Sequence, residues 1–188
     1  GMGSPDILAL QEIGTSNILS RLAQTLRSLD PSLDYQVVFR QGSGDIHLGF
    51  LISSSFKIAD VQQLGTSERL DTGLPLHDRP PLLVALDLPT EPVTRLLVMN
   101  VHLRSFFNID DPDDGERVRN KRYEQAISVA KMVQQYHGSN LIVAGDFNAY
   151  AFSDGYVDVL GQITGQPGLE ALMGNIPIVY PPLTNIST

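Results

Sequence analysis

The sequence predicts one α/β domain in which two or more β-sheets are layered with helices on their outer faces. The chain has 188 residues, and its 42% apolar content is enough for a single core. Strand-like apolar runs alternate with two stretches whose apolar residues recur at helical spacing. No internal repeat, heptad pattern or low-complexity tract breaks this order. These observations together indicate the layered arrangement.

The first half of the chain predicts a strand, a helix and three further strands. The helix is expected over residues 18–29, where apolar residues recur every three or four positions, and Asp30-Pro31 ends it. The expected strands are residues 7–10, 35–39, 46–52 and 56–63. Because only short segments separate the last three strands, we expect them to pair as an antiparallel meander.

The second half predicts a hairpin, a long helix and one more strand. The expected elements are strands over 82–88 and 95–102, a helix over 116–136 and a short strand over 141–144. Prolines between the first two strands favour a turn, so they form a hairpin that ends at His102. Residues 66–81 and the acidic segment 108–115 suit exposed loops. From residue 161 onward, glycine and proline break the pattern.

Composition limits the chemistry that the chain can perform. It has no cysteine, which excludes a disulfide framework, a thiolate metal site and a cysteine nucleophile. Its 21 acidic and 13 basic residues give a net charge of −8, so no general cationic field attracts a phosphate polymer. An anionic substrate must therefore be captured locally or through a metal ion. No apolar run is long enough to cross a bilayer, and we expect no transmembrane segment.

Three segments place polar side chains directly after an apolar strand, where strand ends commonly present side chains to a crevice. They are DILALQE at 6–12, NVHL at 100–103 and GDFN at 145–148. Together they supply an acid, an imidazole and an Asp-x-Asn pair, which indicate hard-cation binding combined with proton transfer. Oxygen ligands of this kind suit Mg²⁺, Mn²⁺ or Ca²⁺.

Taken singly, the same residues have structural interpretations. Glu12 is explained as a solvated carboxylate at a strand end, and His102 as a hydrogen-bonded strand residue. Asp146 and Asn148 are explained as the closure of a turn, because such side chains bond to their own backbone. The functional interpretation therefore depends on the three segments occurring together.

Other polar residues favour structural roles. His47 is expected on the polar face of a strand, His77 in a loop, and His137 near a helix C-terminus, where a cation is favourable. The acidic loop lacks the later glycine and glutamate of an EF-hand, so it is expected to be solvated. A basic cluster is expected at an exposed helix start, offset by the neighbouring acids: Arg117, Arg119, Lys121 and Arg122.

The ordered combination of LQE, NVHL and GDFN resembles the endonuclease/exonuclease/phosphatase superfamily, whose members are deoxyribonuclease I-like. The resemblance covers about residues 5–160. DRPPL at 78–82 and GDFNAYAF at 145–152 are most similar to bacterial secreted nuclease-type members. The resemblance implies a four-layer α/β/β/α sandwich of two mainly antiparallel sheets. It also implies a divalent cation, Mg²⁺ first and Mn²⁺ or Ca²⁺ as alternatives, and a secreted or periplasmic location.

The resemblance also implies a role for each candidate residue. Glu12 would be the metal ligand, and His102 would contact the phosphate. Asp146 and Asn148 would orient the attacking water and the phosphoryl oxygens. Arg79 matches an arginine that precedes the hairpin in several members, and it would bind the phosphate of the substrate.

The function expected from this set is metal-dependent hydrolysis of phosphodiesters, with a nuclease acting on DNA or RNA as the first expectation. A phosphatase or phospholipase acting on small or lipid headgroups is the alternative function, because the negative net charge weakens nonspecific binding to nucleic acid. A noncatalytic module that retains the fold is a third alternative.

The chain departs from the family pattern at both ends. The resemblance predicts an earlier strand that carries an asparagine and a later strand that carries an Asp-His pair, and no Asp-His pair follows Asn148. We therefore expect residues 1–4 to be a cloning remnant and 5–188 to be a partial domain with an incomplete catalytic set. A missing terminal strand would leave a sheet edge through which two copies could pair.

Overall fold

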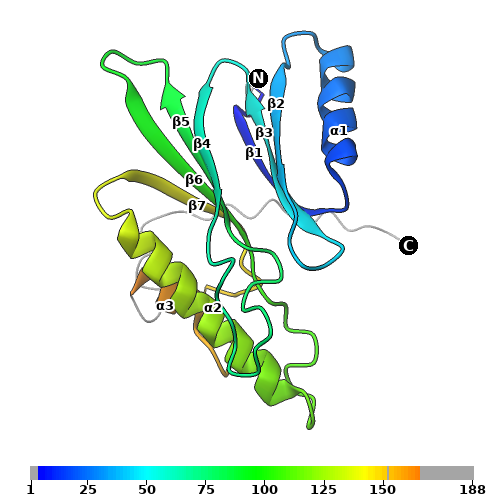
Figure 1. The fold of residues 1–188 in the computed structure, drawn as a ribbon, viewed down its shortest axis with the longest axis vertical. Helices are drawn as coiled ribbons and strands as arrows, with labels where there is room; N and C mark the ends of the chain where they lie inside the picture. Colours follow the sequence, from blue (N-terminus) through cyan, green and yellow to red (C-terminus); the bar gives the residue numbers. More distant parts are fainter. Residues whose placement is uncertain (1–3, 152, 166–188) are drawn as a thin grey trace.

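The computed structural model describes residues 4–151 and 153–165, in which strands and helices alternate along the chain (Figure 1). The strands are β1 (Ile7–Ile13), β2 (Tyr35–Arg40), β3 (His47–Ser53), β4 (Lys57–Gln63), β5 (Leu82–Leu88), β6 (Thr94–His102) and β7 (Asn140–Asp146). The helices are α1 (Ser16–Leu29), α2 (Gly115–Gln135) and α3 (Val159–Thr164).

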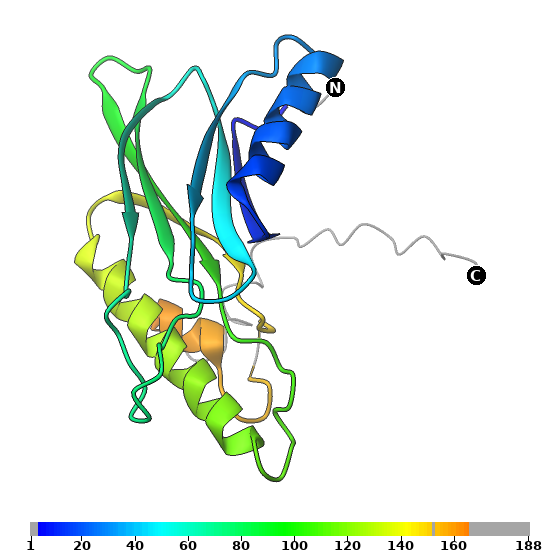
Figure 2. The ribbon, with the colours of Figure 1, turned by 45° about the vertical axis from the view of Figure 1, so that its right-hand side comes forward.

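The strands form two sheets that face each other. One sheet has the order β1-β3-β2 and the other β4-β5-β6-β7, and every pair except β6 with β7 is antiparallel. Strands β6 and β7 are parallel because the long helix α2 carries the chain back to the starting end of the sheet. Helix α1 covers the first sheet, and α2 and α3 cover the second (Figure 2). The expected four-layer sandwich of two mainly antiparallel sheets is confirmed.

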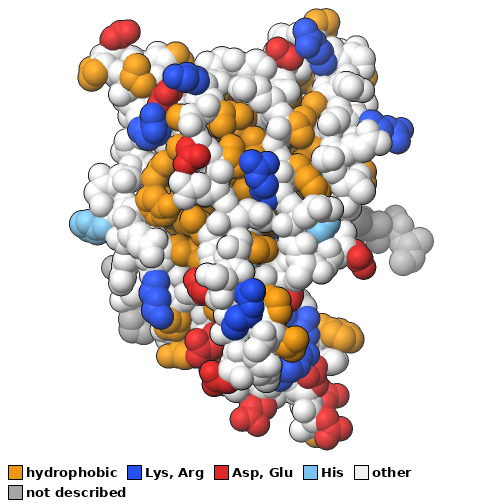
Figure 3. Space-filling model, viewed as in Figure 1, with side chains coloured by type: hydrophobic (Ala, Val, Ile, Leu, Met, Phe, Trp, Pro, Cys, Tyr) orange, Lys and Arg blue, Asp and Glu red, His pale blue; other side chains and the backbone are white. Residues whose placement is uncertain are grey.

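Two apolar clusters hold the layers together. Alternate residues of β5 point to opposite sides: Leu82, Val84 and Leu86 join the cluster between the sheets, whereas Leu83 and Ala85 join the cluster beneath α2 and α3. A strand buried on both faces explains why this run is continuously apolar in the sequence. Figure 3 shows apolar side chains over the strands and many acidic side chains gathered at the opposite end of the molecule.

Helix α1 packs on the first sheet through one leucine and one glycine. Leu19 is fully buried, and its side chain covers Gly49 of β3. A Cβ atom at Gly49 would collide with the Leu19 side chain and would lie 2.9 Å from the Val38 carbonyl oxygen. Glycine at this position therefore sets how closely α1 approaches the sheet.

The expected meander is wrong at its third strand. Strands β2 and β3 pair, but β4 leaves this sheet and pairs with β5 on the other. The reason is that β3 already has a neighbour on each side, since β1 returns to its free edge. The hairpin of β5 and β6 is confirmed. Strand β1 continues to Ile13, and β7 spans Asn140–Asp146, so both are longer than predicted.

Several polar residues expected at the surface are buried. His47 is buried against Phe39 with its ring edge-to-face, and its Nδ1 accepts from the Gly42 amide at 3.1 Å. His77 is buried and lies 2.9 Å from the Ser128 hydroxyl, so the 66–81 segment is only partly exposed. Lys121 and Arg122 are also buried, so the basic cluster does not form a wholly exposed helix start.

We expect Gly49→Ala to destabilise the fold by about 1–3 kcal/mol, because the added methyl group overpacks the contact between α1 and β3. Urea denaturation followed by circular dichroism measures the free energy of unfolding. Gly44→Ala is the matched control, since a Cβ atom there meets nothing within 4 Å. Equal stability of the two variants would contradict the packing described for Leu19.

Candidate functional site

The carboxyl ends of β1, β6 and β7 lie side by side near the middle of the molecule (Figure 1 and Figure 2). In the parallel ladder of β6 and β7, His102 is paired with Asp146, and the imidazole Nε2 lies 3.7 Å from a carboxylate oxygen of Asp146. Partners in a ladder point to the same side of the sheet. Both side chains therefore face the first sheet, where β1 ends.

A buried asparagine joins the two sheets directly beneath this point. Asn100 of β6 is fully buried, and its amide donates to the carbonyl oxygens of Leu10 at 3.0 Å and Gly49 at 3.1 Å. Its side-chain oxygen accepts from the Gln11 side chain at 2.6 Å. These bonds hold the end of β1 against β6, and the next residue along β1 is Glu12.

Glu12 lies where the pairing of β1 with β3 is irregular. The register shifts between Leu10 and Ile13, and Glu12 has a positive φ of 57°. A bulge of this kind commonly re-aims a side chain beside a functional site. The Glu12 side chain is exposed and its carboxylate has no hydrogen bond or ion pair within the described part of the chain, yet its charge acts on both Arg79 and His102. Its carboxylate is thus near the site and unpaired there.

Arg79 and Asn148 complete the cluster by bonding to the same short stretch of backbone. The Arg79 guanidinium donates to the His102 carbonyl at 3.3 Å and to the Leu103 carbonyl at 3.4 Å. The Asn148 amide side chain donates to the Leu103 carbonyl at 3.0 Å, and its backbone amide donates to the Asp146 carboxylate at 2.8 Å. The bond from the Asn148 backbone amide to the Asp146 carboxylate closes a turn, as the structural interpretation of these two residues predicts. The structure therefore joins Arg79, His102, Asp146 and Asn148 through direct contacts, and Glu12 lies near enough for its charge to act on Arg79 and His102.

The environment favours the neutral form of His102. Burial lowers the pKa of the imidazole, the positive charge of Arg79 lowers it further, and the carboxylates of Asp146 and Glu12 partly offset both. The imidazole Nδ1 is buried and has no hydrogen-bond partner within the residues described. Burial also lowers the pKa of Arg79, but a guanidinium stays charged in proteins.

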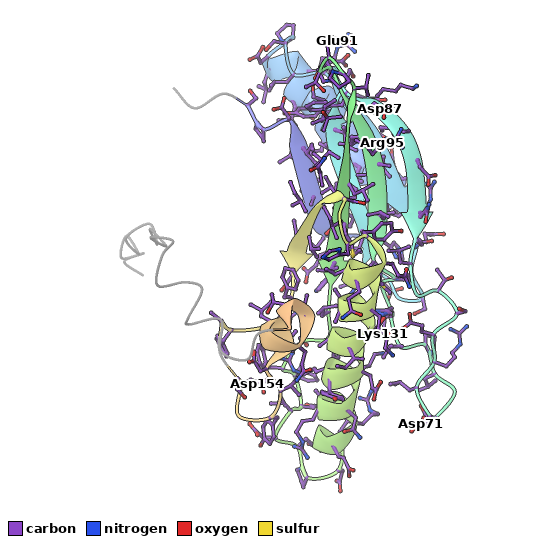
Figure 4. The ribbon with its side chains drawn as sticks, turned by 90° about the vertical axis from the view of Figure 1, so that its left-hand side faces the viewer. Asp71, Asp87, Glu91, Arg95, Lys131 and Asp154 are labelled. Carbon is purple, nitrogen blue, oxygen red and sulfur yellow. The ribbon has the colours of Figure 1, made fainter. Side chains whose placement is uncertain are left out.

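Helix α2 holds the loops around the site through buried polar side chains. The Arg122 guanidinium donates to the Arg104 carbonyl at 2.6 Å and pairs with Asp154 at 2.7 Å. Gln125 accepts from the Arg104 amide at 2.7 Å and donates to the Leu76 carbonyl at 2.8 Å. Figure 4 shows Asp154 in a segment beside α2, on the side opposite Asp71 of the 66–81 loop. Arg122 and Gln125 therefore connect the three loops that carry or follow the site residues.

Lys121 supports Arg79 from the same helix. Its ammonium group lies 2.8 Å from one carboxylate oxygen of Asp78 and 2.9 Å from the other. The Asp78 carbonyl also accepts from the Ser43 amide at 2.8 Å. These contacts fix the residue that precedes Arg79 along the chain.

The carboxylates fit an open cation site rather than a closed one. Within the described residues, no three or more His, Asp or Glu side chains are grouped closely enough to enclose a metal ion. Mg²⁺ is usually bound by one or two carboxylates, with water and substrate oxygens completing the octahedron. Glu12 and Asp146 carry carboxylates, which are the ligand type that such an open site requires.

Sequence reasoning missed Asn100, Gln11 and the buried polar face of α2. The sequence does mark Asn100 as unusual, because it is the one polar residue inside the apolar run from Leu96 to Val101. A polar residue within a buried strand needs hydrogen-bond partners, and those partners identify it as a junction. Arg122 and Gln125 had no such signal, since polar residues are ordinary in a helix.

The four layers and the cluster at the strand ends define the class of α/β/β/α sandwich proteins with a polar site between their two sheets. The model of the endonuclease/exonuclease/phosphatase family matches residues 2–164, and the chain belongs to that family. No curated protein sequence is significantly similar to the chain.

Solved structures share the fold at low sequence identity. A β-hairpin deletion mutant of Staphylococcus aureus beta toxin matches with a TM-score of 0.57 at 13% identity, covering 84% of this chain and 59% of that one. Truncated Caenorhabditis elegans TDP2 matches with a TM-score of 0.52 at 20% identity, covering 82% and 52%. The 2′,3′-cyclic phosphatase ANGEL2, bound to adenosine-2′,3′-vanadate, matches with a TM-score of 0.50 at 22% identity, covering 77% and 40%.

The chain therefore spans between 40% and 59% of the length of these structures. At such identities the likeness concerns the fold. None of the helices in the described residues is both long and apolar enough to span a membrane.

We expect Arg79→Gln to raise the pKa of His102, because the neighbouring positive charge is removed, and Asp146→Asn to lower it, because a negative charge is removed. Nuclear magnetic resonance titration of the imidazole signals, in the presence of chelator, measures both pKa values. His77 is the internal control: burial lowers its pKa to about 4, and neither Arg79 nor Asp146 contributes to that shift. A His102 pKa that moves the same way in both variants would refute the described arrangement.

Proposed function

We propose that this chain carries the catalytic site of a metal-dependent phosphodiester hydrolase whose substrate is DNA or RNA. The observation that carries the proposal is the convergence of Glu12, His102 and Asp146 with Arg79 and Asn148 at the carboxyl ends of three strands. Family membership supports the hydrolysis of phosphoesters, since the family unites endonucleases, exonucleases and phosphatases.

In this proposal Glu12 holds the divalent cation, and Asp146 is the second carboxylate whose charge acts on His102 and Arg79. The cation, when bound, supplies charge neutralisation at the phosphoryl oxygens, which a chain of net charge −8 otherwise lacks. One or two carboxylates suffice for that ion.

The chain's own residues then have separate tasks. Asp146 accepts the proton of the attacking water, and the Asn148 amide bond holds its carboxylate in place. The Nε and one terminal nitrogen of Arg79 donate hydrogen bonds to the carbonyl oxygens of His102 and Leu103. The other terminal nitrogen is left to donate to a phosphoryl oxygen of the substrate. His102, kept neutral by burial, donates a hydrogen bond from its ring to a phosphoryl oxygen.

A phosphatase or phospholipase acting on small headgroups is the second candidate. The net charge of −8 favours it, because a long polyanion is repelled by the protein as a whole. The ANGEL2 structure, described as that of a 2′,3′-cyclic phosphatase, gives this candidate a precedent on the same fold. A secreted or periplasmic location and pairing between copies through a sheet edge stay predictions from the family resemblance.

The purified chain is incubated with plasmid DNA, RNA, bis(4-nitrophenyl) phosphate and phosphorylcholine, with Mg²⁺ or with chelator. We expect slow cleavage of the nucleic acids that requires the metal, because the resemblance predicts an incomplete catalytic set. His102→Ala and Asp146→Asn should each lower kcat by about 100-fold or more, as expected for groups that assist proton transfer and charge stabilisation. His137→Ala is the matched control, because that exposed histidine follows α2, outside the site. Turnover of phosphorylcholine alone would favour the second candidate, and no turnover of any substrate would refute the proposal.

Glu12→Gln separates metal binding from proton transfer. We expect the Mg²⁺ concentration that gives half-maximal activity to rise by about tenfold or more, with part of kcat recovered at saturating metal. A metal titration of the initial rate measures this. Glu91→Gln is the control, since Glu91 lies in the turn between β5 and β6 at the far end of the sheet (Figure 4). An unchanged metal requirement in Glu12→Gln would rule out Glu12 as a ligand.

A further inference from the structure

A buried lysine of α2 pairs with the residue that precedes Arg79. Lys121 is 5% exposed, and its ammonium group lies 2.8 Å and 2.9 Å from the two carboxylate oxygens of Asp78. It also donates to the Pro75 carbonyl at 3.3 Å. An ammonium group has three hydrogens to donate, and these three acceptors account for all of them. Lys121 therefore engages both oxygens of the carboxylate that is next to Arg79 along the chain.

The backbone of Asp78 is held without help from this lysine. Its carbonyl oxygen accepts from the Ser43 amide at 2.8 Å and from the Ser43 hydroxyl at 3.3 Å. The Gly42 backbone packs so closely that a Cβ atom there would collide with the same oxygen. The side chain of Asp78, in contrast, is 39% exposed and has room to rotate. Loss of Lys121 would free the carboxylate while leaving the backbone that leads into Arg79 in place.

One terminal nitrogen of Arg79 has no acceptor among the residues that the structure describes. The Nε and the other terminal nitrogen donate to the His102 and Leu103 carbonyls. Burial lowers the pKa of Arg79, and among the carboxylates that oppose this effect Asp78 acts most strongly. Even so, within the described residues Asp78 forms its ion pair with Lys121 and not with Arg79. Asp78 is thus the carboxylate best placed to compete for this nitrogen, and Lys121 keeps it occupied.

We propose that Lys121 is a positioning residue that holds the Asp78 carboxylate away from the guanidinium of Arg79, so that Arg79 stays available for a phosphoryl group of the substrate. This inference rests on the proposed function, in which Arg79 binds the phosphate. Carboxylates and phosphates compete for a guanidinium because both present paired oxygens to its planar donors. Lysine suits the task, since its compact ammonium group can contact both oxygens of one carboxylate.

The proposal predicts unlike effects for the two partners of one ion pair. Lys121→Met leaves the Asp78 carboxylate to pair with Arg79, whereas Asp78→Asn removes the competing charge. A pair that only stabilised the fold would give the same direction of effect for both, because either change leaves a group without its partner. Phosphate binding and stability therefore separate the two roles.

The test compares these variants in the full chain, with Mg²⁺ and bis(4-nitrophenyl) phosphate. We expect Lys121→Met to raise KM by about 10-fold, the effect of one charge-assisted hydrogen bond, with kcat changed by less than about twofold. Asp78→Asn should leave KM at or below the wild-type value, and Lys121→Met combined with Asp78→Asn should restore it. Lys131→Met is the matched control, since it removes the same charge from an exposed position on α2 (Figure 4).

Nuclear magnetic resonance of the guanidinium reports the pairing without substrate or metal. The Arg79 signals are assigned by their loss in Arg79→Gln and recorded in chelator. We expect Lys121→Met to shift them and the added Asp78→Asn to return them. Urea denaturation measures the stability of each variant, and Lys121→Gln, which retains a donor, replaces Lys121→Met if that variant does not fold.

A rise in KM in Asp78→Asn as large as that in Lys121→Met would overturn the proposal, as would a double variant that does not recover. Arg79 signals that stay in place in Lys121→Met, in a chain that hydrolyses the diester, refute the role of Lys121 alone. Signals that shift and return as expected, in a chain that hydrolyses no phosphodiester, support the competition between Lys121 and Arg79 for Asp78 and refute the proposed function.

Discussion

The arrangement of the site depends on the buried side chain of Asn100. An amide that leaves water costs free energy unless all its hydrogen bonds are replaced, and Asn100 replaces them with partners from β1 and β3 of the facing sheet. Apolar contacts between two sheets tolerate small slides, but directed bonds do not. Asn100 therefore fixes how the end of β1, which carries Glu12, lies against the end of β6, which carries His102.

Helix α2 supports the opposite side of the site with charges that it buries. The pair formed by Arg122 and Asp154 is almost fully excluded from solvent. A buried ion pair contributes little net stability, because desolvation of the two charges offsets their attraction. Its value here is geometric, since the guanidinium also holds the Arg104 carbonyl and covers the Phe106 ring. The loops after β6 and β7 are thus aligned by groups that cannot be moved without exposing or isolating a charge.

Much of the fold follows from local patterns, and its exceptions follow from competition between segments. Strands β5 and β6 were predictable because each is a short apolar run, and helix α2 was predictable because its apolar residues recur at helical spacing. The partner of β4 was not predictable, since it depends on β1 having taken the free edge of β3. Glu12, His102, Asp146 and Asn148 could be predicted as a set because they lie at or just after strand ends in a recognisable order, whereas the prediction for Arg79, which precedes β5, rests on the family resemblance. The partners that orient them, such as Asn100 and Arg122, could not be assigned, since their roles arise only from contacts between distant segments.

The parallel pairing of β6 with β7 ties the chemistry of the site to the core. Side chains alternate along a strand, so a slip of one residue in this ladder would turn the Asp146 carboxylate toward α2. The same slip would turn Leu141 and Val143 away from the apolar cluster beneath α2 and α3. The burial that stabilises β7 therefore also selects the alignment in which Asp146 faces His102.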